Sequence, residues 1–63
     1  MPTKLFIGQQ VRIVSLTHPL SGELGRVISV HADGQAAIVK PHRFPGRLVG
    51  VCIEQVVLAP SMA

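Results

Sequence analysis

The sequence lacks tryptophan and tyrosine, and among its 63 residues it has two phenylalanines, one cysteine and three Asp or Glu residues. The single cysteine, Cys52, excludes an internal disulfide and a multi-cysteine zinc site, and it favours a reducing, cytoplasmic setting. Because Cys52 lies in an aliphatic run, we expect a buried and inert thiol. No apolar segment approaches the length of a signal peptide or a membrane span, so we expect no membrane contact.

Aliphatic side chains make up much of what remains, since 48% of the residues are hydrophobic and only 14% are charged. Val, Ile and Leu must therefore fill the core, and the β-branched residues among them favour strands. The length suits one domain over residues 1–63, with residues 1–4 and 60–63 expected to fray. The net charge is +3, and its meaning depends on where the cations cluster.

Short aliphatic runs separated by glycine and proline predict an all-β fold. Asp33-Gly34 lies between two such runs and predicts a hairpin turn. The run at 26–31 has apolar residues on both faces, which predicts a bend in that strand. Five strands of a small barrel are expected at residues 11–14, 26–31, 36–40, 48–53 and 57–58, with one helical turn at 54–56.

Two segments carry a resemblance to a known family. The patterns Gly8-x-x-Val11-x-Ile13 and Gly22-x-x-Gly25-x-Val27-x-x-Val30 resemble the KOW motif of SH3-like barrels, found in ribosomal proteins and in the transcription factor NusG. Phe44-Pro45-Gly46-Arg47, followed by Val51-x-Ile53-x-Gln55-Val56, is similar to the closing strands of the NusG C-terminal domain, with Pro45 inserted and the acidic residues reduced to Glu54. The resemblance covers residues 8–58. It implies a five-stranded SH3-like barrel and a binding role in a ribosome or transcription assembly.

The most concentrated polar feature is the loop at 40–47, KPHRFPGR, which holds three Lys or Arg residues and one His. Convergent cations bind phosphate groups, and Phe44 is expected either to stack on an unpaired base or to plug the core. The alternative is an ordinary solvated loop. The predicted contacts to RNA or DNA are Arg12, Arg26, Lys40, His42, Arg43 and Arg47, with the backbone of Gly22 and Gly25 approaching the ligand.

The run LVGVCI at 48–53 supports a second hypothesis, because it is apolar on both faces where a barrel strand needs only one. Val49, Val51 and Ile53 share one face, and we expect a protein partner or a second copy of the chain to cover it. The alternative is that bulges and bends turn both faces inward at different points.

The remaining polar residues predict no catalytic site, metal site or cofactor, and no small-molecule substrate is expected. The histidines match no metal-ligand spacing, and the carboxylates form no acid–base pair; these residues are His18, His31, His42, Glu23, Asp33 and Glu54. Type II dihydrofolate reductases are barrels of similar size, but their V-Q-I-Y segment is not found here, where the strand reads V-C-I-E. We therefore expect a binding module rather than an enzyme.

Overall fold

The computed structural model describes residues 4–59, so the fraying predicted at both ends lies outside it except at Lys4. The strands are β1 (Gln10–Ile13), β2 (Leu24–His31), β3 (Ala36–Pro41), β4 (Val49–Cys52) and β5 (Val56–Leu58), and two 3-10 turns, η1 (Ala32–Gly34) and η2 (Ile53–Gln55), lie between them. The all-β prediction is confirmed, and each predicted strand end lies within two residues of an observed one. No helix within the described range has the length and apolar character needed to cross a membrane.

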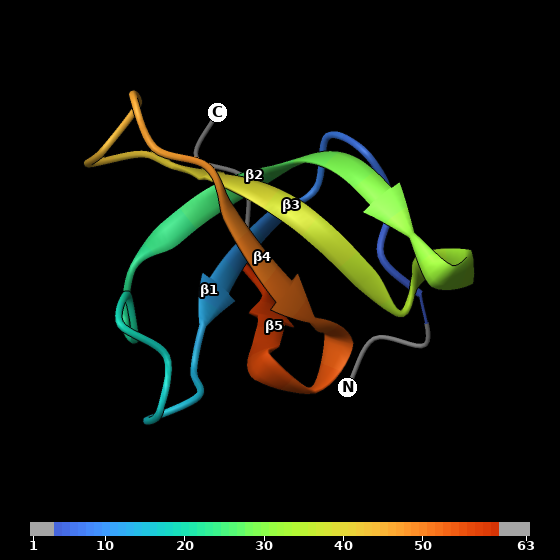
Figure 1. Cartoon of the computed structure of the whole chain (residues 1–63), viewed down its shortest axis with the longest axis horizontal. Coiled ribbons are helices and arrows are strands. Elements are labelled where there is room, and N and C mark those ends of the chain that lie inside the picture. Colours follow the sequence, from blue (N-terminus) through green and yellow to red (C-terminus); the bar gives the residue numbers. More distant parts are fainter. Residues whose placement is uncertain (1–3, 60–63) are drawn as a thin grey trace.

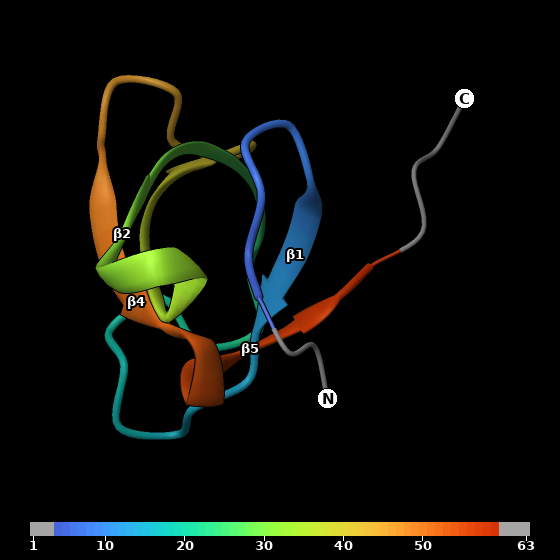
Figure 2. The ribbon, with the colours of Figure 1, turned by 90° about the vertical axis from the view of Figure 1, so that its right-hand side faces the viewer.

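All five strands belong to one antiparallel sheet with the order β4-β3-β2-β1-β5 (Figure 1). The sheet curls around the core, and η2 leads from the edge strand β4 to the other edge strand β5 (Figure 2). Within residues 4–59, β4 and β5 do not pair with each other. The sheet is therefore open, and the closed barrel is not confirmed.

A β-bulge in β2 produces the predicted bend. The register with β3 runs regularly through Val27 and then shifts before Ser29, which leaves Ile28 as the additional residue. An extra residue reverses which side chains face inward. Before the bulge, Val27 is fully buried. After the bulge, Val30 packs against the core, although it lies three residues after Val27 and a regular strand would place the two on opposite faces.

The core consists only of aliphatic side chains, and among the described residues it contains no polar group. In the segment before β1, the side chain of Leu5 is 1% exposed and belongs to the core, whereas the neighbouring Phe6 is 59% exposed. The Leu5 amide donates a 2.9 Å hydrogen bond to the carbonyl of Gly34 in η1, which holds this segment across the end of the β2–β3 hairpin. The buried residues are Leu5, Val11, Ile13, Val27, Ala37, Val39, Val51, Ile53 and Val56.

The partner-face hypothesis requires the side chains of Val49, Val51 and Ile53 to face solvent, but in the structure they face inward. Val51 in β4 and Ile53 in η2 lie in the core, and Val49 packs against it. Pairing of β4 with β3 explains this, because Val51 is opposite the buried Ala37 and Val49 is opposite the buried Val39. The prediction of an exposed apolar face at Val49, Val51 and Ile53 is therefore wrong for the described chain. Cys52 alternates with these residues and is exposed, which also corrects the expected buried thiol.

Candidate nucleic-acid interface

The convex face of β1, β2 and β3 carries three of the cations predicted from the sequence, Arg12, Arg26 and Lys40. Arg26 on β2 is directly opposite Lys40 on β3, and Gln10 on β1 is opposite Arg26 on its other side. The next row contains Arg12, which is opposite Leu24. Neighbouring strands are about 4.8 Å apart, so Arg12, Arg26 and Lys40 come from three strands that span about 10 Å. All three side chains are exposed.

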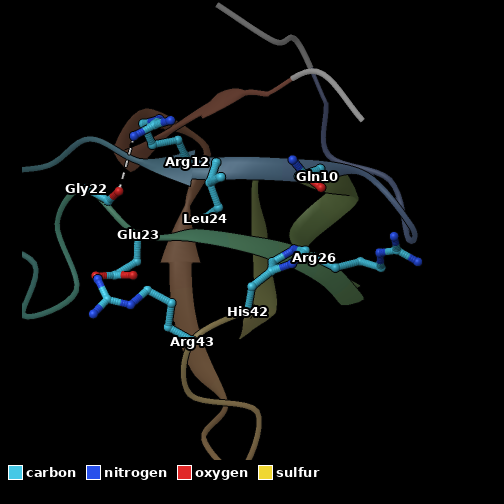
Figure 3. Close-up of a pocket in the computed structure, with 8 residues that line it drawn as sticks. All are labelled: Gln10, Arg12, Gly22, Glu23, Leu24, Arg26, His42 and Arg43. Atoms are coloured by element: carbon cyan, nitrogen blue, oxygen red, sulfur yellow. Dashed lines mark hydrogen bonds and ion pairs between the residues drawn. The ribbon is translucent and has the colours of Figure 1, made fainter. Parts of the chain in front are cut away.

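Two adjoining hollows lie on this face, and we call the residues Arg12, Arg26, Lys40, His42 and Arg43 the basic face. The first hollow has a volume of about 420 Å³ and is lined by Gln10, Arg12, Gly22, Glu23, Leu24, Arg26, His42 and Arg43 (Figure 3). The second is lined by Arg26, Lys40, Pro41, His42 and Pro45. Because Arg26 and His42 line both hollows, the two form one continuous surface.

One carboxylate interrupts the positive charge of this surface. Glu23 accepts a hydrogen bond from Nη1 of Arg43 at 3.4 Å, and their side chains are 20% and 75% exposed respectively. An exposed pair at this distance contributes at most about 1 kcal/mol to stability. Its main effect is electrostatic: Glu23 offsets Arg43, while the side chains of Arg26 and Lys40 have no hydrogen-bond or ion-pair partner within residues 4–59.

The charge of the chain is distributed unevenly as a result. Four Lys or Arg residues lie on the basic face or beside it with one carboxylate, Glu23. The formal charge of the side chains around the two hollows is therefore +3, and an approaching anion meets an attractive field.

The other predicted contact residues, Gly22, Gly25 and Arg47, differ in their positions relative to the two hollows. Gly25 is buried in β2, where a Cβ would meet Val39 Cγ1 and lie 3.0 Å from the Lys40 carbonyl oxygen, so this glycine serves packing. Gly22 lines the first hollow with φ of +91°, but its amide donates to Ile13 and its carbonyl accepts from Arg12. Arg47 lies in the turn after β3 and lines neither hollow.

Sequence reasoning missed the contribution of Leu24 and Gln10 to this surface. Leu24 is half-buried and lies across the strands between Arg12 and His42, whose amide donates to the Leu24 carbonyl at 3.0 Å. The signal was present, because Leu24 and Arg26 are two residues apart and therefore share a face of one strand. This spacing alone does not locate the surface, because only the pairing register shows which residues of β1 and β3 lie beside Leu24 and Arg26.

The histidines lie on separate elements and have separate roles. His18 Nε2 lies 3.3 Å from the Gly50 carbonyl, and His18 Nδ1 accepts from the Leu20 amide, which secures the loop between β1 and β2. His31 Nε2 lies 3.0 Å from Ser29 Oγ. Only His42 lines the hollows. Within residues 4–59 no group of three His, Cys, Asp or Glu side chains is placed to hold a metal ion.

Comparison with known proteins adds no relationship to this geometry: no family model, no curated protein and no solved structure matches the chain.

Proposed function

We propose that this chain is a non-catalytic binding module that contacts the phosphate backbone of a nucleic acid through its basic face. The observation that carries the proposal is that four Lys or Arg side chains line the two hollows together with a single carboxylate. Exposed cations without carboxylate partners are free to replace the counterions of a phosphate backbone. The proposal places the module in the cytoplasm, where a reducing environment keeps an exposed thiol such as Cys52 free.

The directly opposed pair Arg26 and Lys40 supports this reading. Like charges opposite each other on neighbouring strands destabilise a sheet by a few tenths of a kcal/mol. An anion between the two side chains would convert that repulsion into attraction. Such an arrangement fits a surface whose role is binding better than one whose role is solubility alone.

The proposal includes the SH3-like barrel of the KOW type as the architecture. In its support, the sheet curls around its core (Figure 2), with β2 bent by a bulge. Gly8 and Gly22, the first and second glycines of the resemblance, both adopt positive φ, at +94° and +91°. L-residues rarely adopt this conformation, so the two positions have a physical reason to be glycine. A place in a ribosome or transcription assembly follows from the same resemblance.

The test is fluorescence anisotropy of labelled single-stranded RNA, single-stranded DNA and duplex DNA, each titrated with the protein at low and high salt. We expect binding that weakens steeply as salt increases. Absence of binding to all three probes at low salt would refute the proposal.

A second candidate function is contact with a protein, and it rests on a different end of the molecule. Phe6 and Ile7 are 59% and 70% exposed, and with Val30 they line a largely apolar hollow beside η1. Exposed apolar side chains gathered in this way mark interaction sites. Light scattering coupled to size exclusion tests self-association, and Phe6→Ser with Ile7→Ser is expected to abolish any dimer found. A wild-type monomer would exclude the homo-oligomer.

A further inference from the structure

We infer that the first hollow of the basic face accepts one unpaired guanine base of a single-stranded nucleic acid, with Glu23 as the residue that recognises it. This inference rests on the proposed function and specifies its ligand. It starts from the one feature of the hollow that phosphate binding does not explain, the carboxylate among the cations.

Glu23 divides the first hollow into two chemically different ends. A phosphate is repelled by a carboxylate, so the backbone of the ligand is expected at the other end, near Arg26 and Lys40. Leu24 lies between the two ends (Figure 3). From Glu23 to Arg26 the chain advances three residues, about 10 Å along an extended strand. This length is comparable to the distance between the Watson–Crick edge of a purine and its own phosphate.

The middle of the hollow suits the flat face of a base. Leu24 offers an apolar floor, and its cross-strand neighbours are Arg12 on one side and His42 on the other. Guanidinium and imidazole planes are groups on which unpaired bases stack. The volume of about 420 Å³ lies within the range of small-ligand sites.

The carboxylate selects among the four bases by its hydrogen-bonding capacity. An ionised Glu only accepts hydrogen bonds, through two oxygens in one plane. Guanine presents two adjacent N–H donors, N1–H and the N2 amino group, on its Watson–Crick edge. Adenine, cytosine and uracil each place an acceptor beside their donor on that edge. In a duplex this edge is occupied by the paired base, so the ligand must be single-stranded.

The second hollow indicates a strand rather than a free nucleotide. It continues from the first through Arg26 and His42 to Lys40 and Pro45. A mononucleotide fills one hollow, whereas a strand places a neighbouring phosphate beside Lys40. Free GMP is therefore expected to compete weakly, and competition as effective as that of an oligonucleotide would overturn the assignment to a strand.

The experiment compares three labelled RNAs by fluorescence anisotropy: oligouridine, oligouridine with one central guanosine, and the same RNA with inosine at that position. Inosine lacks only the N2 amino group. We expect the guanosine RNA to bind about tenfold or more tightly than oligouridine, with inosine between them, because hydrogen bonds to a charged group are the stronger ones. Equal affinity for the three RNAs would overturn the inference.

Two variants assign the preference to Glu23. Glu23→Gln is expected to bind all three RNAs equally, and to bind oligouridine more tightly than the wild type because a repulsive charge has gone. Arg43→Gln removes the partner of Glu23 but keeps its carboxylate, so it is expected to weaken binding of all three RNAs alike and keep the preference. A preference that persists in Glu23→Gln would refute the role of Glu23. If the wild type binds none of these RNAs and also fails to bind single-stranded and duplex DNA at low salt, the proposed function itself fails.

Discussion

Replacing Arg26 and Lys40 together by glutamine is expected to flatten the salt dependence of RNA binding. These two side chains and Arg12 are the cations of the basic face that no carboxylate offsets. If each contacts one phosphate, the slope of log affinity against log salt is about −0.7 per contact on a single strand, or about −2 in total. A fourfold increase in salt then weakens wild-type binding about 20-fold.

The double variant keeps only the contact from Arg12. Its slope falls to about −0.7, and the same fourfold increase in salt weakens its binding only about threefold. The assay is anisotropy of a labelled oligouridine over a salt series, which gives the slope directly. Binding at the lowest salt is expected to be weaker as well, because two phosphate contacts have been lost.

The control is Lys4→Gln, which removes one positive charge that lies far from the basic face. Lys4 contacts the turn η1, at the far end of the hairpin from Arg26. From Arg26 to His31 the strand advances about 16 Å, beyond the Debye length of about 10 Å at 0.1 M salt. The control slope is expected to match the wild type. A flatter slope in the control would refute the reasoning, because binding would then depend on net charge alone.

Loss of fold does not explain the expected result. Arg26 and Lys40 are exposed and directly opposed, so replacing them relieves a repulsion of a few tenths of a kcal/mol. The urea midpoint of the double variant is therefore expected to equal or exceed that of the wild type. A lower midpoint would contradict the account of this pair as mutually repulsive.

Three further predictions concern the fold. Gly25→Ala is expected to lower the free energy of unfolding by about 2 kcal/mol, since the new Cβ meets a buried Val side chain and a backbone carbonyl. Gly46→Ala has open space around it and is expected to change the free energy of unfolding little. Urea unfolding measures both variants, and equal values would contradict the packing argument. Leu5→Ala is expected to lower the free energy of unfolding by about 3 kcal/mol, and Phe6→Ala by less than about 1 kcal/mol. The reverse order would contradict the core described above. Cys52 is expected to react fully with a thiol reagent in the native protein, and protection until unfolding would show that the side chain is buried.

The strands follow from local pattern, which is why sequence reasoning located them. Alternation of Val and Ile with polar residues, Asp33-Gly34 as the hairpin turn, and apolar residues on both faces of β2 predict the turn and the bend that the structure shows. Each of these signals acts over a few neighbouring residues, where backbone sterics and side-chain direction decide the conformation.

Local pattern does not decide which face of a strand is buried. The run LVGVCI has two apolar faces, and the pattern correctly divided them into Val49, Val51 and Ile53 on one side and Cys52 on the other. Pairing with β3 then placed the first set against Ala37 and Val39 in the core. Local pattern also does not decide which of Leu5 and Phe6 is buried, because this segment has no periodicity of its own. The hydrogen bond from the Leu5 amide to the Gly34 carbonyl sets its direction.

The amino-acid sequence alone determines that this chain is aliphatic, basic and built of short strands, because these properties belong to single residues and their near neighbours. The candidate site depends on contacts between distant positions. Arg26 meets Lys40 across a strand pair, and Arg43 reaches Glu23 from 20 residues away. Such pairings arise only when the register of the sheet is set by burial of one common core. The tertiary structure therefore decided which cations act together and which carboxylate lies among them.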